Sequence, residues 1–151
     1  MAKNTIKVKK YSDVIEEITA TDVAITPGYL LELTSEGLVQ AHSTPGGNCL
    51  PMFALENELE GEDIDTDYAV SDKIQVWIPN RGDQVYALLN DGETAVIGSW
   101  LDSAGNGKLK VVDTASDDSP VAGIVGQAVE AVDMSYSSKA DPSGRIIVRI
   151  L

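Results

Sequence analysis

Residues 145–151 have the sequence RIIVRIL, a pattern that favours an extended chain. Every second residue from Ile146 to Ile150 is apolar and would point to one face, whereas Arg145 and Arg149 would point to the other, because successive side chains of a β-strand alternate between its faces. A helix would spread the same residues around its axis. The stretch therefore predicts a strand with one buried face.

Five further segments have the length and composition of strands. They are rich in β-branched, aromatic and leucine residues, and the full set is 29–33, 38–42, 74–78, 85–89, 109–112 and 146–151. Pairs such as Pro27-Gly28 and Asp91-Gly92 interrupt the chain at short intervals, which leaves room for strands but rarely for helices. We expect an all-β fold, a small barrel or a sandwich.

The start of the chain differs from the rest in charge and pattern. In residues 6–9 apolar and cationic side chains alternate, which suits a strand whose apolar face needs a partner sheet and which alone would be mobile. Asp13 and Glu16 could cap a short helix. We therefore divide the chain into an N-terminal arm or connector, residues 1–20, and a single β-rich domain, residues 21–151. Four lysines lie in the first ten residues: Lys3, Lys7, Lys9 and Lys10.

Composition limits the classes of function. The chain has 151 residues, of which 43% are hydrophobic and 23% charged, which suits one folded domain. Its net charge of -13 disfavours binding to nucleic acid or to an anionic membrane. The sequence contains no apolar run of bilayer length and no signal-peptide pattern at its start. We expect synthesis in a cytoplasm-like compartment.

The sequence offers few residues of the types that act as catalytic nucleophile or base. His42 is the one histidine and Cys49 the one cysteine, so a Cys-His pair is conceivable, but a histidine at a strand end and a small core thiol are the favoured interpretation. An enzyme would need a pocket with clustered, perturbed groups around His42. We expect no catalytic residue and no cofactor.

Three short motifs have simpler interpretations than a functional site. Residues 63–67 alternate carboxylates like the opening of an EF-hand, but Tyr68 replaces the required glycine and Ile74 the required glutamate. A solvated acidic loop without metal is expected. Residues 81–83 spell the Arg-Gly-Asp of adhesion peptides and are expected to form a turn between strands, as residues 105–107 are expected to form a hairpin turn.

The order of the segments resembles that of the small decoration, or cement, proteins of tailed bacteriophages, from about residue 25 to the C-terminus. No single element is diagnostic, and Ser99 stands where an aspartate would follow the turn glycine. The elements that carry the resemblance are, in order, Pro27-Gly28 with Glu32, Gly37, His42 before Gly46-Gly47, Phe53 to Glu56, Gly61, Ile64-Asp65, Tyr68-Ala69, Asp72, Gly82 to Ala87, Gly98 with Leu101, Gly107 to Leu109, Gly126 to Ala131 and Arg145 to Ile150.

The resemblance implies a structural virion protein with a barrel-like or tulip-like β-body. Such proteins are often trimers that bind the major capsid protein on the capsid exterior through an N-terminal segment. An alternating, lysine-rich strand also suits addition to the open edge of another protein's sheet, although a basic tail without a role is the alternative. The residues expected to bind the capsid are Lys3, Ile6, Lys7, Val8, Lys9, Lys10 and Tyr11.

A second hypothesis keeps the β-body and changes its task. The loop from Pro45 to Pro51 and the acidic loop would form the recognition surface of a ligand-binding or adhesion module displayed on a phage particle. The place where the protein is found discriminates between the two, because a cement protein copurifies with full heads, whereas an adhesion module sits on tails or fibres or acts free.

Overall fold

The computed structural model describes residues 4–9, 14–21, 23–113, 123–135 and 144–151. Within these ranges the fold is all-β, as predicted, and no helix is long and apolar enough to cross a membrane. The strands are β1 (Lys7–Lys9), β2 (Ile15–Thr19), β3 (Leu31–Leu33), β4 (Val39–Ala41), β5 (Phe53–Ala54), β6 (Lys73–Trp77), β7 (Gln84–Leu88), β8 (Thr94–Ala95), β9 (Trp100–Ser103), β10 (Leu109–Val111), β11 (Gly126–Ala128), β12 (Val132–Asp133) and β13 (Arg145–Ile150).

A six-stranded antiparallel sheet of order β1-β7-β13-β11-β9-β10 is the largest element. Its strand β13 pairs on one side with β7 and on the other with β11, so that Val148 lies opposite both Val85 and Ala128. A single bridge between Leu89 and Leu109 brings the end of β7 back to β10 and curls the sheet. None of the described sheets closes into a barrel.

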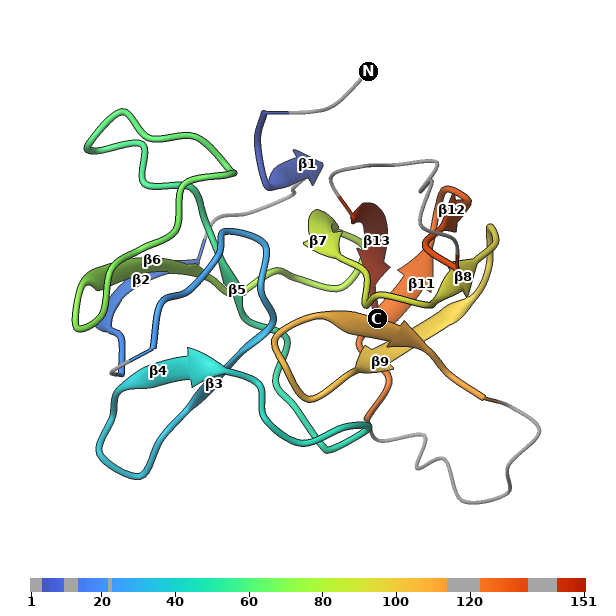
Figure 1. Ribbon diagram of the computed structural model, residues 1–151, viewed down its shortest axis with the longest axis horizontal. Helices are drawn as coiled ribbons and strands as arrows, with labels where there is room; N and C mark the ends of the chain where they lie inside the picture. Colours follow the sequence, from blue (N-terminus) through green and yellow to red (C-terminus); the bar gives the residue numbers. More distant parts are fainter. Residues whose placement is uncertain (1–3, 10–13, 22, 114–122, 136–143) are drawn as a thin grey trace.

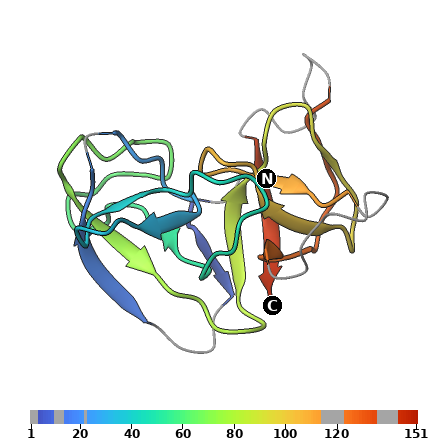
Figure 2. The ribbon, with the colours of Figure 1, turned by 90° about the horizontal axis from the view of Figure 1, so that it is seen from below.

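Three smaller sheets complete the fold, with orders β2-β6-β5, β3-β4 and β12-β8. Figures 1 and 2 both show β2, β6, β3 and β4 gathered on one side of the molecule and the six-stranded sheet on the other. Two apolar clusters form the core, and the first joins Trp77 of β6 to residues of the six-stranded sheet. One is built around Trp77, Leu101 and Ile146, and the other around Ile25 and Val76.

All six segments predicted as strands overlap a strand, and both predicted turns are present. Residues 105–107 connect β9 to β10, whose register places Leu109 opposite Ser103. Residues 81–83 lie between β6 and β7 in a turn, where the Asp83 carboxylate accepts a hydrogen bond from the Asn80 amide at 2.8 Å. The prediction of a short helix near Asp13 is wrong, because residues 15–19 form β2 and pair with β6.

Two strands within residues 1–20, the predicted arm or connector, pair with strands of the body. β1 pairs with β7, and Ile6 just before it is fully buried in the same cluster as Trp77. The alternating segment does require a partner sheet, as the sequence indicates, but this chain itself provides one. β2 likewise runs antiparallel to β6 along its whole length, from Ile15 to Thr19.

Arg145 is also buried, at 1% exposure, although the alternation predicted an outward position like that of the exposed Arg149. Its Nη1 donates to the Pro27 carbonyl at 2.9 Å, and its Nη2 donates to the Ile64 carbonyl. Gly28 adopts a φ of +94°, and a Cβ there would lie 2.7 Å from the Arg145 Nη1. The close packing and the positive φ both favour glycine.

Candidate functional site

The edge strand β1 is the first candidate site, because it contains the middle of the predicted capsid-binding segment. It is the terminal strand of the six-stranded sheet, and its outer edge pairs with no strand among the described residues. Lys7 lies opposite Val85 and Lys9 opposite Gln84, with an irregularity between the two pairs. An edge of this kind presents backbone groups that another chain can pair with.

The structure places the seven predicted capsid-binding residues differently from one another. Ile6 is buried in the core and is unavailable to a partner, which corrects its expected role. Lys7 and Val8 are half-buried, and Lys9 ends β1. The other three residues lie outside the described ranges: Lys3, Lys10 and Tyr11.

Glu56 fixes the beginning of this edge. Its buried carboxylate accepts a hydrogen bond from the Thr5 hydroxyl at 2.8 Å and another from the Ile6 amide at 3.2 Å. The Ile6 carbonyl in turn accepts from the Tyr86 amide at 2.8 Å. Hydrogen bonds to an ionised acceptor are stronger than neutral ones. Glu56 therefore holds the start of β1 by hydrogen bonds in addition to the packing of Ile6. No local sequence pattern indicates this contact, because 50 residues separate Ile6 from Glu56.

His42 is the centre of the second candidate site. It follows β4, is 2% exposed, and its Nδ1 lies 2.8 Å from the Ser103 hydroxyl. Its Nε2 lies 3.4 Å from the Asn48 carbonyl and 3.7 Å from the Glu32 carboxylate. Both neighbours of Nε2 are acceptors, so Nε2 carries the ring proton and, in neutral His42, the Ser103 hydroxyl donates to Nδ1.

This arrangement brings a serine, a histidine and a glutamate together, but it does not form a usable hydrolytic centre. Ser103 is fully buried and its hydroxyl also accepts from the Gly105 amide at 3.1 Å, so no substrate reaches it in this conformation. A nucleophile has to meet the substrate carbonyl directly. The polar groups instead hold β4 against β9.

Cys49 does not form a reactive pair with His42. It is half-buried, and burial, followed by the negative charges of Asp102 and Glu32, raises the pKa of its thiol to about 11. Reactive cysteines have a lowered pKa and lie near cations. Asp102 is itself buried, which raises its pKa despite the opposing charge of Lys110.

An open cleft of about 280 Å³ lies beside His42. Its polar wall is formed by Glu32, His42 and the segment 48–49, and its apolar surfaces by Leu31, Leu33, Leu50 and Met52. Two of these leucines are exposed, Leu33 at 55% and Leu50 at 63%. The cleft therefore joins the β3–β4 hairpin to the loop between Pro45 and Pro51.

The acidic loop, residues 63–67, forms a local turn and contacts the body through Asp65. The Asp63 carboxylate accepts hydrogen bonds from the Asp65 amide and the Thr66 hydroxyl, both at 3.0 Å. Asp65 lies 3.5 Å from the Arg145 Nη2. The first carboxylate thus closes a local turn, as Asp side chains commonly do. In the described part of the chain no group of three or more His, Cys, Asp or Glu side chains could hold a metal ion.

An exposed apolar turn between β8 and β9 was not predicted. Val96 is 60% exposed, Ile97 72% and Trp100 37%.

A scan against protein-family models finds no match to the chain, and a search of curated proteins finds no significant relative.

Proposed function

We propose that this protein is a structural virion protein that binds the outer surface of a phage capsid and stabilises the head by bridging subunits of the major capsid protein. The observation that carries the proposal is the charge and position of β1. Its Lys7 and Lys9 stand at a sheet edge of a molecule whose net charge is -13. A basic edge strand on an acidic body favours docking in one orientation.

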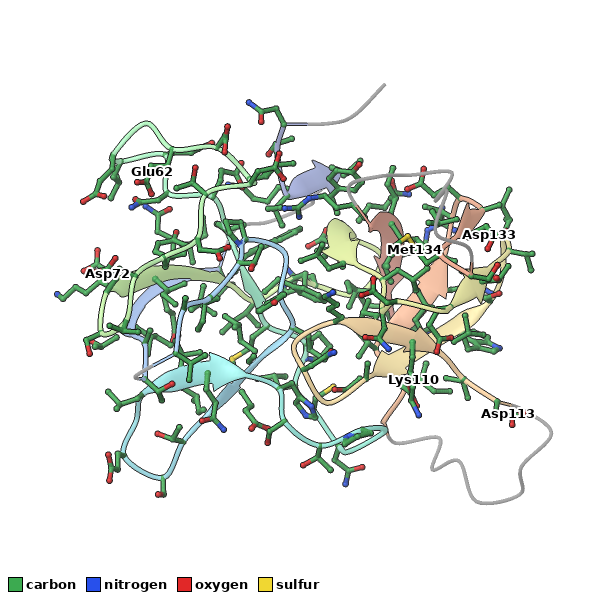
Figure 3. All side chains as sticks on the ribbon, in the orientation of Figure 1. Glu62, Asp72, Lys110, Asp113, Asp133 and Met134 are labelled. Atoms are coloured by element: carbon green, nitrogen blue, oxygen red, sulfur yellow. The ribbon has the colours of Figure 1, made fainter. Side chains whose placement is uncertain are left out.

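Acidic side chains at both ends of the molecule contrast with the lysines of β1. Figure 3 shows Glu62 and Asp72 at one end of the molecule and Asp113 and Asp133 at the opposite end. Acidic groups at both ends disfavour self-association through them, whereas β1 adds two lysines at a sheet edge. Association into a homotrimer on the capsid would multiply a modest contact through avidity. The proposal involves no enzyme activity, cofactor, nucleic acid or membrane.

Binding to undecorated heads tests the proposal. A Lys7→Glu, Lys9→Glu double variant should bind at least about tenfold more weakly than the unchanged protein, because two cations of the edge are reversed. Lys73→Glu is the matched control, since Lys73 is exposed on β6 and pairs with Glu17 at 3.1 Å. Cosedimentation with heads measures both. Equal binding of the double variant and the unchanged protein would exclude β1 as the contact.

A ligand-binding or adhesion module is the second candidate, and the cleft beside His42 favours it. The cleft is part of the Pro45 to Pro51 loop region expected to form a recognition surface. The two candidates differ in location: the cement protein copurifies with full heads in capsid-like stoichiometry, whereas the module is found on tails or fibres. Fractionation of particles, followed by detection of the protein, separates them.

A further inference from the structure

The cleft between the β3–β4 hairpin and residues 48–50 combines an apolar floor with a charged wall. Leu31 and Met52 are buried at its base, and Leu33 and Leu50 stand exposed at its rim. Exposed leucines on both sides of a concavity are suited to covering the aliphatic part of a ligand. The volume of about 280 Å³ lies near the lower end of ordinary ligand pockets, which limits the ligand to a small group.

The polar wall of the cleft combines the His42 ring with two acceptors, the Glu32 carboxylate and the Asn48 carbonyl. Glu32 Oε1 accepts from the Gln40 side chain at 2.8 Å and from the Ser43 hydroxyl at 2.6 Å. Glu32 Oε2 lies 3.7 Å from the His42 Nε2, which is beyond hydrogen-bond length. The carboxylate is thus held in place through one oxygen, and the other keeps capacity for a donor.

Glu32 is charged at neutral pH. Burial raises its pKa, but hydrogen bonds from Ser43 and Gln40 and the charge of His42 outweigh that effect and hold the pKa below its usual value. The Asn48 carbonyl adds a second acceptor near His42. The free Glu32 oxygen therefore complements a cation with N–H donors, and the net charge of -13 attracts cations to the whole surface.

We propose that the cleft binds an alkylammonium group, with the ammonium on Glu32 Oε2 and the methylene chain between Leu33 and Leu50. A free aliphatic amine and a lysine side chain of another protein present the same group, a charged head on an apolar stem. Binding here does not depend on capsid binding, because β1 belongs to a different sheet.

A titration with n-butylammonium chloride, followed by methyl NMR, tests the proposal. The shifts should be confined to the cleft, at Leu31, Leu33, Leu50 and Met52, and n-butanol at the same concentrations should bind at least about tenfold more weakly. Nα-acetyl-lysine methylamide is the second arm. Tighter binding of that compound assigns the site to a polypeptide lysine, and tighter binding of butylammonium assigns it to a free amine.

Three variants test whether binding is specific to the cleft. Glu32→Gln should weaken butylammonium binding about tenfold, whereas Glu36→Gln, which removes an exposed charge from the turn of the same hairpin, should leave it unchanged. Leu50→Ser, at the exposed rim, tests the apolar contact without touching the Glu32 hydrogen bonds, and should also weaken binding. Equal binding of butanol and butylammonium, equal effects of the two glutamate variants, or shifts spread over the acidic surface would overturn the proposal.

Discussion

The buried carboxylate of Glu56 accepts a hydrogen bond from the Thr5 hydroxyl at 2.8 Å and so joins the start of the chain to the segment that follows β5. The same carboxylate accepts from the Ile6 amide. The edge strand β1 therefore begins at a fixed point, and its orientation relative to β7 does not depend on the lysines that follow.

Glu56→Ala should loosen this anchor. It removes the acceptor of two hydrogen bonds and leaves the Ile6 amide unsatisfied, at a cost of about 1–3 kcal/mol in the free energy of unfolding. Hydrogen exchange of the Tyr86 amide, which donates to the Ile6 carbonyl, should accelerate. Glu58→Ala, at an exposed position of the same segment, is the control. Unchanged exchange at Tyr86 would show that pairing alone holds β1.

Ile6 should behave as a core residue. Ile6→Ala removes a fully buried side chain and should lower the free energy of unfolding by about 2–5 kcal/mol. Ile97→Ala makes the same chemical change at a position that is 72% exposed, and should alter it by less than about 0.5 kcal/mol. Denaturant unfolding compares the two. Similar small losses for both variants would restore the separate arm predicted from the sequence.

Strands could be predicted from the sequence where apolar and polar residues alternate over the whole strand. The burial of a side chain could not be predicted where a distant part of the chain covers that face of the sheet. The segment 74–78 was predicted from its pattern and overlaps β6, Lys73–Trp77. Strands of two residues, such as β5 and β12, are too short to show any alternation. Arg145 was placed outside because its neighbours alternate, but Pro27 and Ile64 come from distant parts of the chain to cover it.

For the candidate sites, the sequence indicated the central residues but not their partners. His42 stood out in the sequence because it is the one histidine, and the lysines near the start because they cluster. The partners of these residues, Glu32 at the cleft and Glu56 at the edge strand, are ordinary members of a set of 24 acidic residues. Only the pairing of strands brings them close, so no local pattern could have distinguished them.

Arg145 and Arg149 provide a matched pair on β13. Arg145→Ala should cost about 3 kcal/mol or more in the free energy of unfolding, because the carbonyls of Pro27 and Ile64 lose their donor and a cavity remains. Arg149→Ala, at an exposed position, should cost less than about 0.5 kcal/mol. Thermal or denaturant unfolding of the two variants checks this, and equal losses would contradict the structural role of the buried arginine.

The Cys49 thiol should react slowly with iodoacetamide. A pKa of about 11 against the ordinary 9.0 means about a hundredfold less thiolate in the folded protein than in the unfolded chain near neutral pH. The alkylation rate of the folded protein should still rise between pH 9 and about 11, where the rate in denaturant has levelled. Folded and unfolded rates that coincide at every pH would mean that the thiol is not buried.

Heat-induced release of DNA from decorated and undecorated heads is the most direct test of the cement function. A protein that binds the intact shell stabilises that state by mass action, so decorated heads should release DNA at a higher temperature. Occupancy has to be confirmed on the same decorated sample. Equal release temperatures at full occupancy would contradict the cement function and leave the ligand-binding module as the better account.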